Sequence, residues 1–297
     1  MRLERLWNKP IITPESSPSI GDNINGTSII KVPSWVKNPL GKYYLYFAHH
    51  QGTYIRLAYS DTIEGPWKIY EPGVFRIEQT PDKYRDSIWH LASPDIYIDD
   101  RNKRLFMYYH CAIRSEIMRD QVTFMAISED GINFTSKREI IGEKTYWRVF
   151  KYKDYFYSFE MYGQVRRSRD GITGWEKGPL IFQDYDVRHN TVKLSGAKLF
   201  VFFTIRGDNP PPEKICVAEM DISGDWMKWK EGPYQVLLKP ETKYEGADCP
   251  LTISAIGPAK GRENALRDPF YFADNGKEYI FYCGGGESCI AVAELLP

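Results

Sequence analysis

An aromatic strand pattern that recurs five times is the feature that most constrains the fold of this chain. The copies are rich in Tyr, Phe and aliphatic residues, and they occupy residues 43–47, 105–109, 155–159, 199–203 and 279–283. A short turn carrying Lys with Gly, Asn or Asp precedes each copy, which is typical of β-hairpins. Because a missed repeat leads to the wrong fold, this pattern is interpreted before any single motif.

A second element follows each aromatic strand, at residues 54–67, 122–134, 163–175, 214–226 and 288–296. In the first four copies a strand leads into an acidic turn and then to an aromatic residue. Each repeat therefore predicts four antiparallel strands, A to D, and four-stranded units repeated around an axis are β-propeller blades. We predict an all-β, five-bladed β-propeller that forms a single domain over residues 1–297. The predicted blades span residues 25–80, 90–142, 146–185, 188–240 and 267–297.

The last copy ends before any fourth strand, and the N-terminus offers the missing one. Residues 5–13 include Trp7-Asn8-Lys9-Pro10, which is similar to the Trp-Lys-Glu-Gly-Pro pattern at 229–233. We predict that this segment completes the last blade and closes the ring, because closure removes an open sheet edge. A β-sandwich of similar strand count is the alternative, but it does not explain a repeat that continues from one end of the chain to the other.

Composition excludes several classes of partner. Lys+Arg and Asp+Glu are both 39, so the formal charge of zero argues against nucleic acid and against an anionic membrane as partner. The five cysteines are scattered without a CxxC pair, which indicates neither a disulfide framework nor a zinc site. No signal peptide and no apolar span are recognisable, so a cytoplasmic location is expected. We expect no cofactor, although a metal ion held by His110 or Asp95 stays open, as does the oligomeric state.

Blade geometry predicts which face carries chemistry. Strand A is innermost, and its start lies on the same face as the end of strand B, because the two strands are antiparallel neighbours. The starts of strand A supply polar side chains in every blade, namely Asn25, Asp95, Arg148, Arg188 with His189, and Arg267 with Asp268. The ends of strand B add His49, His50, His110, Glu160, Arg206 with Asp208, and Glu287. With His90, all five histidines of the chain fall on this face.

Hydrolysis of a glycoside needs one group that protonates the leaving oxygen and a second that activates water or attacks the anomeric carbon. Asp95 and Asp268 are the candidates for the base, and Glu160 and His189 for the proton donor. A buried hydrogen-bonding role is the alternative for each aspartate. The predicted substrate-binding residues are Asn25, His49, His50, Arg56, Trp89, His90, His110, Trp147, Arg148, Arg188, Arg267, Asp248 and Glu287, with Glu245 as a further acid on the rim.

Two groups of these residues have a second interpretation. Trp89 and Trp147 could stack on sugar rings or pack between blades. Arg148, Arg188 and Arg267 could bind an anionic ligand, since guanidinium groups bind carboxylate or phosphate in a bidentate manner. They could equally neutralise the acidic side chains around them.

Several motifs carry a family resemblance over most blades. They are Asn-Gly-Thr-Ser-Ile-Ile-Lys-Val-Pro at 25–33, Gly-Lys-Tyr-Tyr-Leu-Tyr-Phe-Ala at 41–48, Tyr-Ile-Arg-Leu-Ala at 54–58, Gly-Pro-Trp at 65–67, Ser-Pro-Asp-Ile at 93–96 and Arg-Asp-Pro at 267–269. The chain resembles the five-bladed glycosidases of glycoside hydrolase family 43. It is more similar still to uncharacterised glycosidase-like proteins related to the neoagarobiose hydrolases of family 117.

The resemblance implies a reaction on carbohydrates, but the catalytic carboxylates of family 43 are not present at the matching positions. Family 43 places carboxylates at the strand A starts of blades one, three and four, where this chain has Asn25, Arg148 and His189. The similarity to family 117, in which a base carboxylate works with a histidine acid, implies His189 or another histidine of this face as the donor.

The function expected from these observations is that of a glycoside hydrolase acting on a short oligosaccharide with an anionic group. The long connection at residues 239–267 would shape a pocket and favour exo-action. A glycoside phosphorylase and a non-catalytic carbohydrate-binding propeller are the alternatives.

Overall fold

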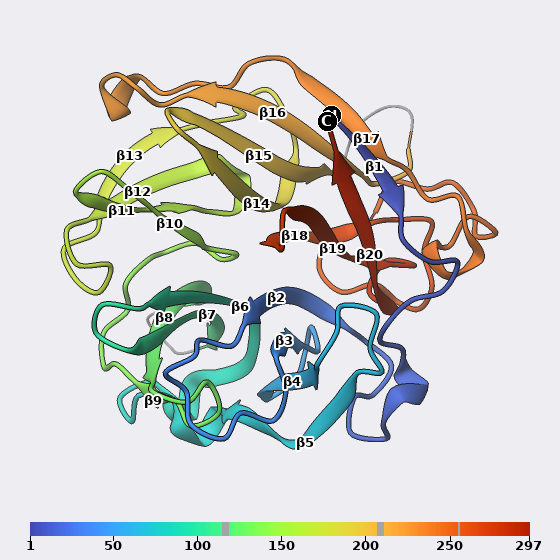
Figure 1. The fold of residues 1–297 in the computed structure, drawn as a ribbon. Coiled ribbons are helices and arrows are strands. Elements are labelled where there is room, and N and C mark those ends of the chain that lie inside the picture. Colours follow the sequence, from blue (N-terminus) through green and yellow to red (C-terminus); the bar gives the residue numbers. More distant parts are fainter. Residues whose placement is uncertain (115–118, 207–210, 255) are drawn as a thin grey trace. The chain divides into compact units, whose positions relative to one another are not determined.

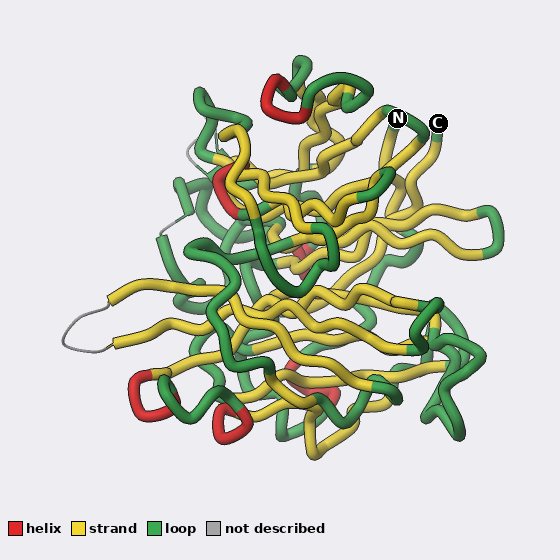
Figure 2. The backbone as a smooth tube through the Cα atoms, turned by 90° about the vertical axis from the view of Figure 1, so that its left-hand side faces the viewer, coloured by secondary structure: helices red, strands yellow, loops and turns green. Residues whose placement is uncertain are grey.

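Five four-stranded antiparallel sheets make up the described chain and confirm the predicted all-β, five-bladed β-propeller (Figure 1). The computed structural model describes residues 1–114, 119–206, 211–254 and 256–297, so that Asp208 lies outside the described residues. Within these ranges every helix is a single turn, and none is long enough to cross a membrane (Figure 2). The turns are η1 (Pro14–Ser16), η2 (Ile77–Gln79), η3 (Arg85–Ser87), η4 (Met161–Gly163), η5 (Trp226–Lys228) and η6 (Lys243–Glu245).

The chain divides into two compact units, which are described separately. The two-blade unit comprises Ile11–Trp147, and the three-blade unit comprises Met1–Pro10 with Arg148–Pro297. The domain boundaries expected from the sequence, a single domain over residues 1–297, stay a prediction.

The two-blade unit holds the first two sheets, in the strand orders β2-β3-β4-β5 and β6-β7-β8-β9. The aromatic repeats form the second strand of each sheet, where nearly every side chain is buried, and they pack with the neighbouring strands into one hydrophobic core. The strands are β2 (Asn25–Lys31), β3 (Tyr43–Ala48), β4 (Tyr54–Ser60), β5 (Lys68–Arg76), β6 (Ile88–Asp99), β7 (Arg104–Arg114), β8 (Arg119–Ser128) and β9 (Thr135–Ser136).

The three-blade unit holds the sheets β10-β11-β12-β13, β14-β15-β16-β17 and β1-β20-β19-β18. Apolar side chains of its third and fourth blades form one core, and those of the fourth and fifth blades form another. The strands are β10 (Arg148–Tyr152), β11 (Tyr155–Phe159), β12 (Gln164–Ser168), β13 (Glu176–Leu180), β14 (Val187–Ser195), β15 (Lys198–Ile205), β16 (Lys214–Asp221), β17 (Tyr234–Leu238), β18 (Arg267–Asp274), β19 (Lys277–Gly284), β20 (Cys289–Leu296) and β1 (Arg2–Arg5).

The N-terminal strand completes the fifth blade, as predicted, but it lies earlier in the chain than the predicted segment at 5–13. Strand β1 pairs with β20 from Arg2 opposite Leu296 to Arg5 opposite Ala293 (Figure 1). Leu3 is buried between outward-facing neighbours, which gives β1 the two-residue period of a half-buried strand. The predicted segment contains Pro10, which has no backbone N–H to donate to a sheet.

Arg5 ends this strand with a clamp on Glu245, the rim acid considered above. Its guanidinium donates to both carboxylate oxygens of Glu245, at 2.8 and 2.9 Å, and the Tyr282 hydroxyl donates to the same carboxylate at 2.7 Å. Burial alone would raise the pKa of Glu245, but these hydrogen bonds and two from backbone N–H groups lower it. The surroundings of Glu245 are therefore those of a structural anchor for β1.

Four of the five innermost strands carry a β-bulge at the start. The pairing register shifts at residues 25–28 of β2, 92–95 of β6, 187–190 of β14 and 267–270 of β18. Bulges re-aim side chains, and they are common next to active sites. Three bulge residues have positive φ, namely Gly26 (66°), Ser93 (47°) and Asp268 (49°).

The glycine is required at one of these bulges. A Cβ on Gly26 would lie 2.7 Å from the Cα of Ser93, and a side chain would be strained at this φ in any case. The bulges of β2 and β6 therefore touch through their backbones.

Candidate active site

The start of β18 carries a fully buried arginine surrounded by acids. Arg267 donates from Nε to Glu213 (3.0 Å), from Nη1 to Glu287 (3.2 Å) and from Nη2 to Glu263 (2.6 Å). Arg188, on β14, lies 3.5 Å from the same carboxylate of Glu213. We call these five residues the carboxylate–guanidinium cluster.

The charges of this cluster compensate one another. Burial alone would lower the pKa of Arg267, but the attraction of Glu213, Glu287 and Glu263 outweighs it and raises that pKa. Burying a guanidinium or a carboxylate is tolerable only when it is paired in this way. The arrangement supports the interpretation that Arg188 and Arg267 neutralise acids.

An imidazole–carboxylate pair lies beside this cluster. His189, in the bulge of β14, has its Nε2 atom 3.6 Å from Oδ1 of Asp268, in the bulge of β18, and both side chains are buried. On the other side of the ring, Nδ1 lies 3.3 Å from Oγ1 of Thr204, which in turn donates to Glu213 at 3.0 Å. The predicted donor His189 and the predicted base Asp268 are thus adjacent within the three-blade unit.

The third blade contributes the other predicted acid, and it is already paired. Glu160 follows β11, is fully buried, and forms an ion pair with Nε of Arg166 at 2.9 Å while accepting from Ser158 at 3.1 Å. Arg148, at the start of β10, donates from Nε to the Asn190 carbonyl at 3.1 Å and lies over the ring of Phe270.

The long connection between the fourth and fifth blades is anchored on predicted site residues. Arg188 donates to the Gly257 carbonyl at 2.6 Å, and Glu287 accepts from the backbone N–H of Ala259 at 3.1 Å. Arg206 donates to the Ser254 carbonyl at 3.2 Å. These contacts hold the described part of the connection against β14, β15 and the turn after β19.

Asp248 lies on this connection but not in the buried cluster. It forms an ion pair with Arg262, and this contact lowers the pKa of its half-exposed carboxyl group. The sequence predicts that Asp248 lies on a loop at the rim of the pocket.

The two-blade unit gathers three of the predicted histidines into a second site, which we call the histidine cluster (His50, His90 and His110). The Nε2 atoms of His90 and His110 are 3.2 Å apart, and the His50 and His90 rings meet edge to face. Asn25, in the bulge of β2, has its amide nitrogen 3.3 Å from Nδ1 of His50. Burial, with smaller effects of His50 and Arg114, lowers the pKa of His90 to about 3.

A neutral His90 follows from this low pKa. One imidazole can then donate Nε2–H to the other, and the pair can be buried without a counter-ion. His90 is thus a buried, polar and neutral member of the cluster at ordinary pH.

The other predicted residues of this unit surround the cluster in different ways. Trp89 is half-buried between the edge of His90 and the guanidinium of Arg114. His49 lies 3.3 Å from Asp22, and buried Arg56 donates to the Asn23 carbonyl at 3.1 Å.

Trp147 and Asp95 are both buried in the two-blade unit. Trp147 stacks on Tyr108, which supports the core-packing interpretation for this tryptophan. Asp95 lies directly opposite Tyr108 in the β6–β7 ladder. Because Asp95 and Asp268 belong to different units, their convergence on one cavity stays a prediction.

Three participants were missed by sequence reasoning, namely Thr204, Glu213 and Glu263. Glu213 immediately precedes β16, the third strand of its blade, and the start of a third strand lies on the same face as the end of the second. Including the starts of strand C in the search would have found Glu213. Nothing in the local sequence pairs it with Arg267, 54 residues later.

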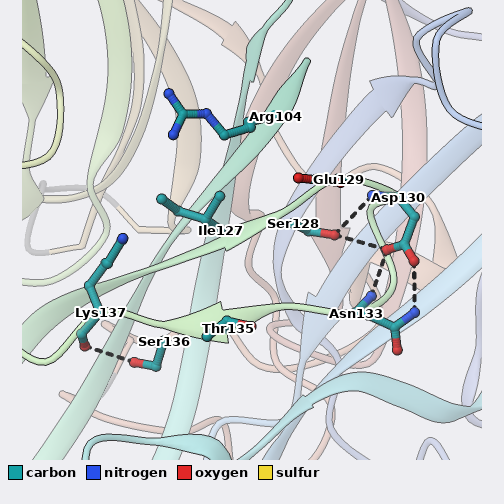
Figure 3. Close-up of a pocket in the computed structure, with 9 residues that line it drawn as sticks. All are labelled: Arg104, Ile127, Ser128, Glu129, Asp130, Asn133, Thr135, Ser136 and Lys137. Atoms are coloured by element: carbon teal, nitrogen blue, oxygen red, sulfur yellow. Dashed lines mark hydrogen bonds between the residues drawn. The ribbon is translucent and has the colours of Figure 1, made fainter. Parts of the chain in front are cut away.

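Two other features of the described residues bear on ligand binding. No group of three or more His, Cys, Asp or Glu side chains that could hold a metal occurs among them. A surface pocket on the second blade surrounds the turn after β8, where Asp130 accepts from the side chains of Ser128 and Asn133 (Figure 3). The residues that line this pocket include none of the predicted site residues.

The comparisons with known proteins agree on the fold. No protein-family model matches the chain. The uncharacterized protein R118 of Acanthamoeba polyphaga mimivirus is 36% identical over 300 residues, which cover 92% of this chain and 83% of that protein. Among solved structures, the GH43 β-xylosidase/α-arabinofuranosidase CoXyl43 from a compost microbial metagenome, in complex with xylotriose, is 13% identical with a TM-score of 0.64, covering 99% of this chain and 95% of that one.

A structure from the GH130 family of mannoside phosphorylases, described as containing hydrolases of β-1,2 mannosidic linkages in Candida mannan, is 12% identical. It has a TM-score of 0.68 and covers 99% of this chain and 94% of its own. At such identities the likeness shows a common five-bladed fold.

Proposed function

This chain belongs to the family of the uncharacterized protein R118 of Acanthamoeba polyphaga mimivirus, and from that premise we propose that it is a glycoside hydrolase. The observation that carries the proposal is the 3.6 Å approach of His189 Nε2 to Asp268 Oδ1 at the bulged starts of two inner strands. The structural neighbours with bound or cleaved glycosides lend support at the level of the fold.

The proposed chemistry needs one proton donor and one base. The His189–Asp268 pair gives a proton to the glycosidic oxygen as the bond from that oxygen to the anomeric carbon breaks. A base removes a proton from the water whose oxygen bonds to the anomeric carbon, and Asp95→Asn tests the aspartate that the sequence predicts for this role. One water is consumed, and the proton lost to the base restores the donor through solvent.

The proposed substrate is a short oligosaccharide attacked from its end. The anchoring of the described part of this long connection on Arg188, Arg206 and Glu287 supports a closed rim, which favours chain ends. An anionic group on the sugar gains no support from Arg267 or Arg188, because carboxylates occupy both guanidiniums.

The test is a screen of aryl glycosides and short oligosaccharides, followed by kinetics of Asp268→Asn, His189→Gln and Asp95→Asn. Each change is expected to lower kcat/KM by about 100-fold or more, the usual contribution of a general acid or base. Asn tolerates positive φ better than most residues, so Asp268→Asn removes the charge and leaves the bulge unstrained. Asp274→Asn, at the far end of β18, is the matched control and is expected to keep full activity.

Two other functions are separate outcomes of the same screen. Turnover that requires inorganic phosphate would indicate a glycoside phosphorylase, a function that appears in the description of the GH130 neighbour. Sugar binding that persists in all three variants without any turnover would indicate a carbohydrate-binding propeller. In that case the deep burial of His189 and Asp268 would belong to a structural pair.

A further inference from the structure

The hydrogen bonds behind His189 determine where its ring proton sits. Glu213 faces the guanidiniums of Arg267 and Arg188, so it is a carboxylate that only accepts hydrogen bonds. Thr204 Oγ1 is 3.0 Å from Oε1 of Glu213, and the hydroxyl must therefore be the donor in this contact.

A threonine hydroxyl has one hydrogen, and Glu213 receives it. The same oxygen lies 3.3 Å from Nδ1 of His189, and in this contact it can act only as an acceptor. The proton of the ring must then be on Nδ1, as Nδ1–H donating to Thr204. The second carboxylate oxygen of Glu213 is held by Arg267, which prevents the chain of hydrogen bonds from reversing.

With its proton on Nδ1, a neutral His189 presents a lone pair at Nε2. That lone pair faces Asp268 Oδ1 at 3.6 Å inside a buried site. Two acceptors in such proximity repel each other unless a proton lies on one of them.

We propose that Thr204 and Glu213 are positioning residues that fix His189 as the Nδ1–H tautomer, so that Nε2, the nitrogen that faces Asp268, takes up and gives the transferable proton. The proposal rests on the proposed function only in assigning that proton to catalysis. The tautomer itself is a property of the folded chain. Arg267 and Arg188 act one step further away, because both guanidiniums lie against the carboxylate of Glu213.

The test reads the tautomer directly, by NMR of protein labelled with ¹⁵N in the histidine rings. The chain has five histidines, and His189→Gln assigns the signals of the ring in question. As the pH is raised until the ring is neutral, we expect Nδ1 to be the protonated nitrogen. Protonation of Nε2 instead would overturn the proposal, whether or not a substrate is ever found.

A matched pair of variants isolates the hydroxyl. Thr204→Val removes it at nearly constant volume and is expected to shift the tautomer ratio about tenfold towards Nε2–H, the effect of losing one buried hydrogen bond. Thr204→Ser keeps the hydroxyl and is expected to retain the native ratio. Thr191→Val removes another buried hydroxyl from the same blade, one that accepts from the Tyr271 N–H, and should change nothing at His189.

Kinetics then separate the two proposals. If a substrate is found, Thr204→Val should lower kcat about tenfold with little change in KM, and Thr204→Ser should restore it. Glu213→Gln should act in the same direction as Thr204→Val. An unchanged tautomer in Thr204→Val contradicts the positioning role, whereas an altered tautomer without any turnover contradicts only the hydrolase.

Discussion

The carboxylate–guanidinium cluster and the histidine cluster occupy equivalent places, at the bulged starts of inner strands, yet they bury polar groups by opposite means. In the three-blade unit, Arg267 is surrounded by three acids and full charges compensate each other. In the two-blade unit, His90 and His110 share a hydrogen bond, and His90 has a pKa of about 3.

This difference indicates that a bulge determines the direction of the side chains at a strand start but not their charge. A paired ionic cluster loses its balance when one member is removed, because the partner charge stays buried. The neutral imidazole of His90 is instead sensitive to protons, because charging this buried ring leaves it without a counter-ion. Stability should therefore respond to mutation in the first cluster and to pH in the second.

The largest expected effect tests charge compensation. Arg267→Met leaves Glu213 and Glu287 buried without their guanidinium, and we expect a loss of about 3–5 kcal/mol in the free energy of unfolding. Lys198→Met is the matched control, because its ion pair with Glu219 is exposed and screened by solvent, so that its loss is expected to change the stability far less. The measurement is urea denaturation. Equal stability of the two variants would show that the cluster does not depend on charge balance.

A second change tests the backbone contact at the bulge in the two-blade unit. Gly26→Ala places a Cβ against Ser93 at positive φ, with an expected cost of about 2–4 kcal/mol from strain and overpacking. Gly196→Ala has a similar φ of 60° but no atom within 4 Å of the added Cβ. It should therefore show only the strain, about 1 kcal/mol. Similar thermal stability of the two variants would contradict a tight contact at Gly26.

Per pH unit, the smallest expected effect is the pH dependence of stability that comes from His90 in the histidine cluster. His90 binds its proton at about pH 3 when folded and near 6.5 when unfolded, so between these values the unfolded state holds the extra proton. Stability should therefore fall with decreasing pH across this window, by about 1.4 kcal/mol per pH unit from this group. His90→Asn should flatten the dependence by that slope, whereas His49→Gln, at a half-buried ring, should not. An unchanged slope in His90→Asn would assign the acid sensitivity to other groups.

Much of the fold was predictable because each propeller strand and its turn have a recognisable local sequence pattern. The Tyr43–Phe47 segment and its four repeats are the second strands of their blades, with hairpin turns where Gly and Asn predict them. The exact position of β1 was not predictable, because Trp7-Asn8-Lys9-Pro10 is similar in sequence to an outer strand. The contact of Arg5 with Glu245, which anchors β1, joins residues 240 positions apart and has no local signal.

The candidate site was predictable in part for the same reason. His189 and Asp268 could be placed at strand starts from their own blades. The contacts of Glu213 and Thr204 depend on how neighbouring strands pair and on which rotamers the side chains adopt. A local sequence pattern predicts neither. The relation of Asp95 to Asp268 is a matter between the two units and stays a prediction.

The pairing of β1 with β20 determines when the fifth blade can complete its folding. During synthesis β1 is made before the other strands of the propeller. Its partner β20 is made only after all the strands between them. Until then the fifth blade has three strands at most, and the outer edge of β20 can recruit a foreign strand as readily as its own.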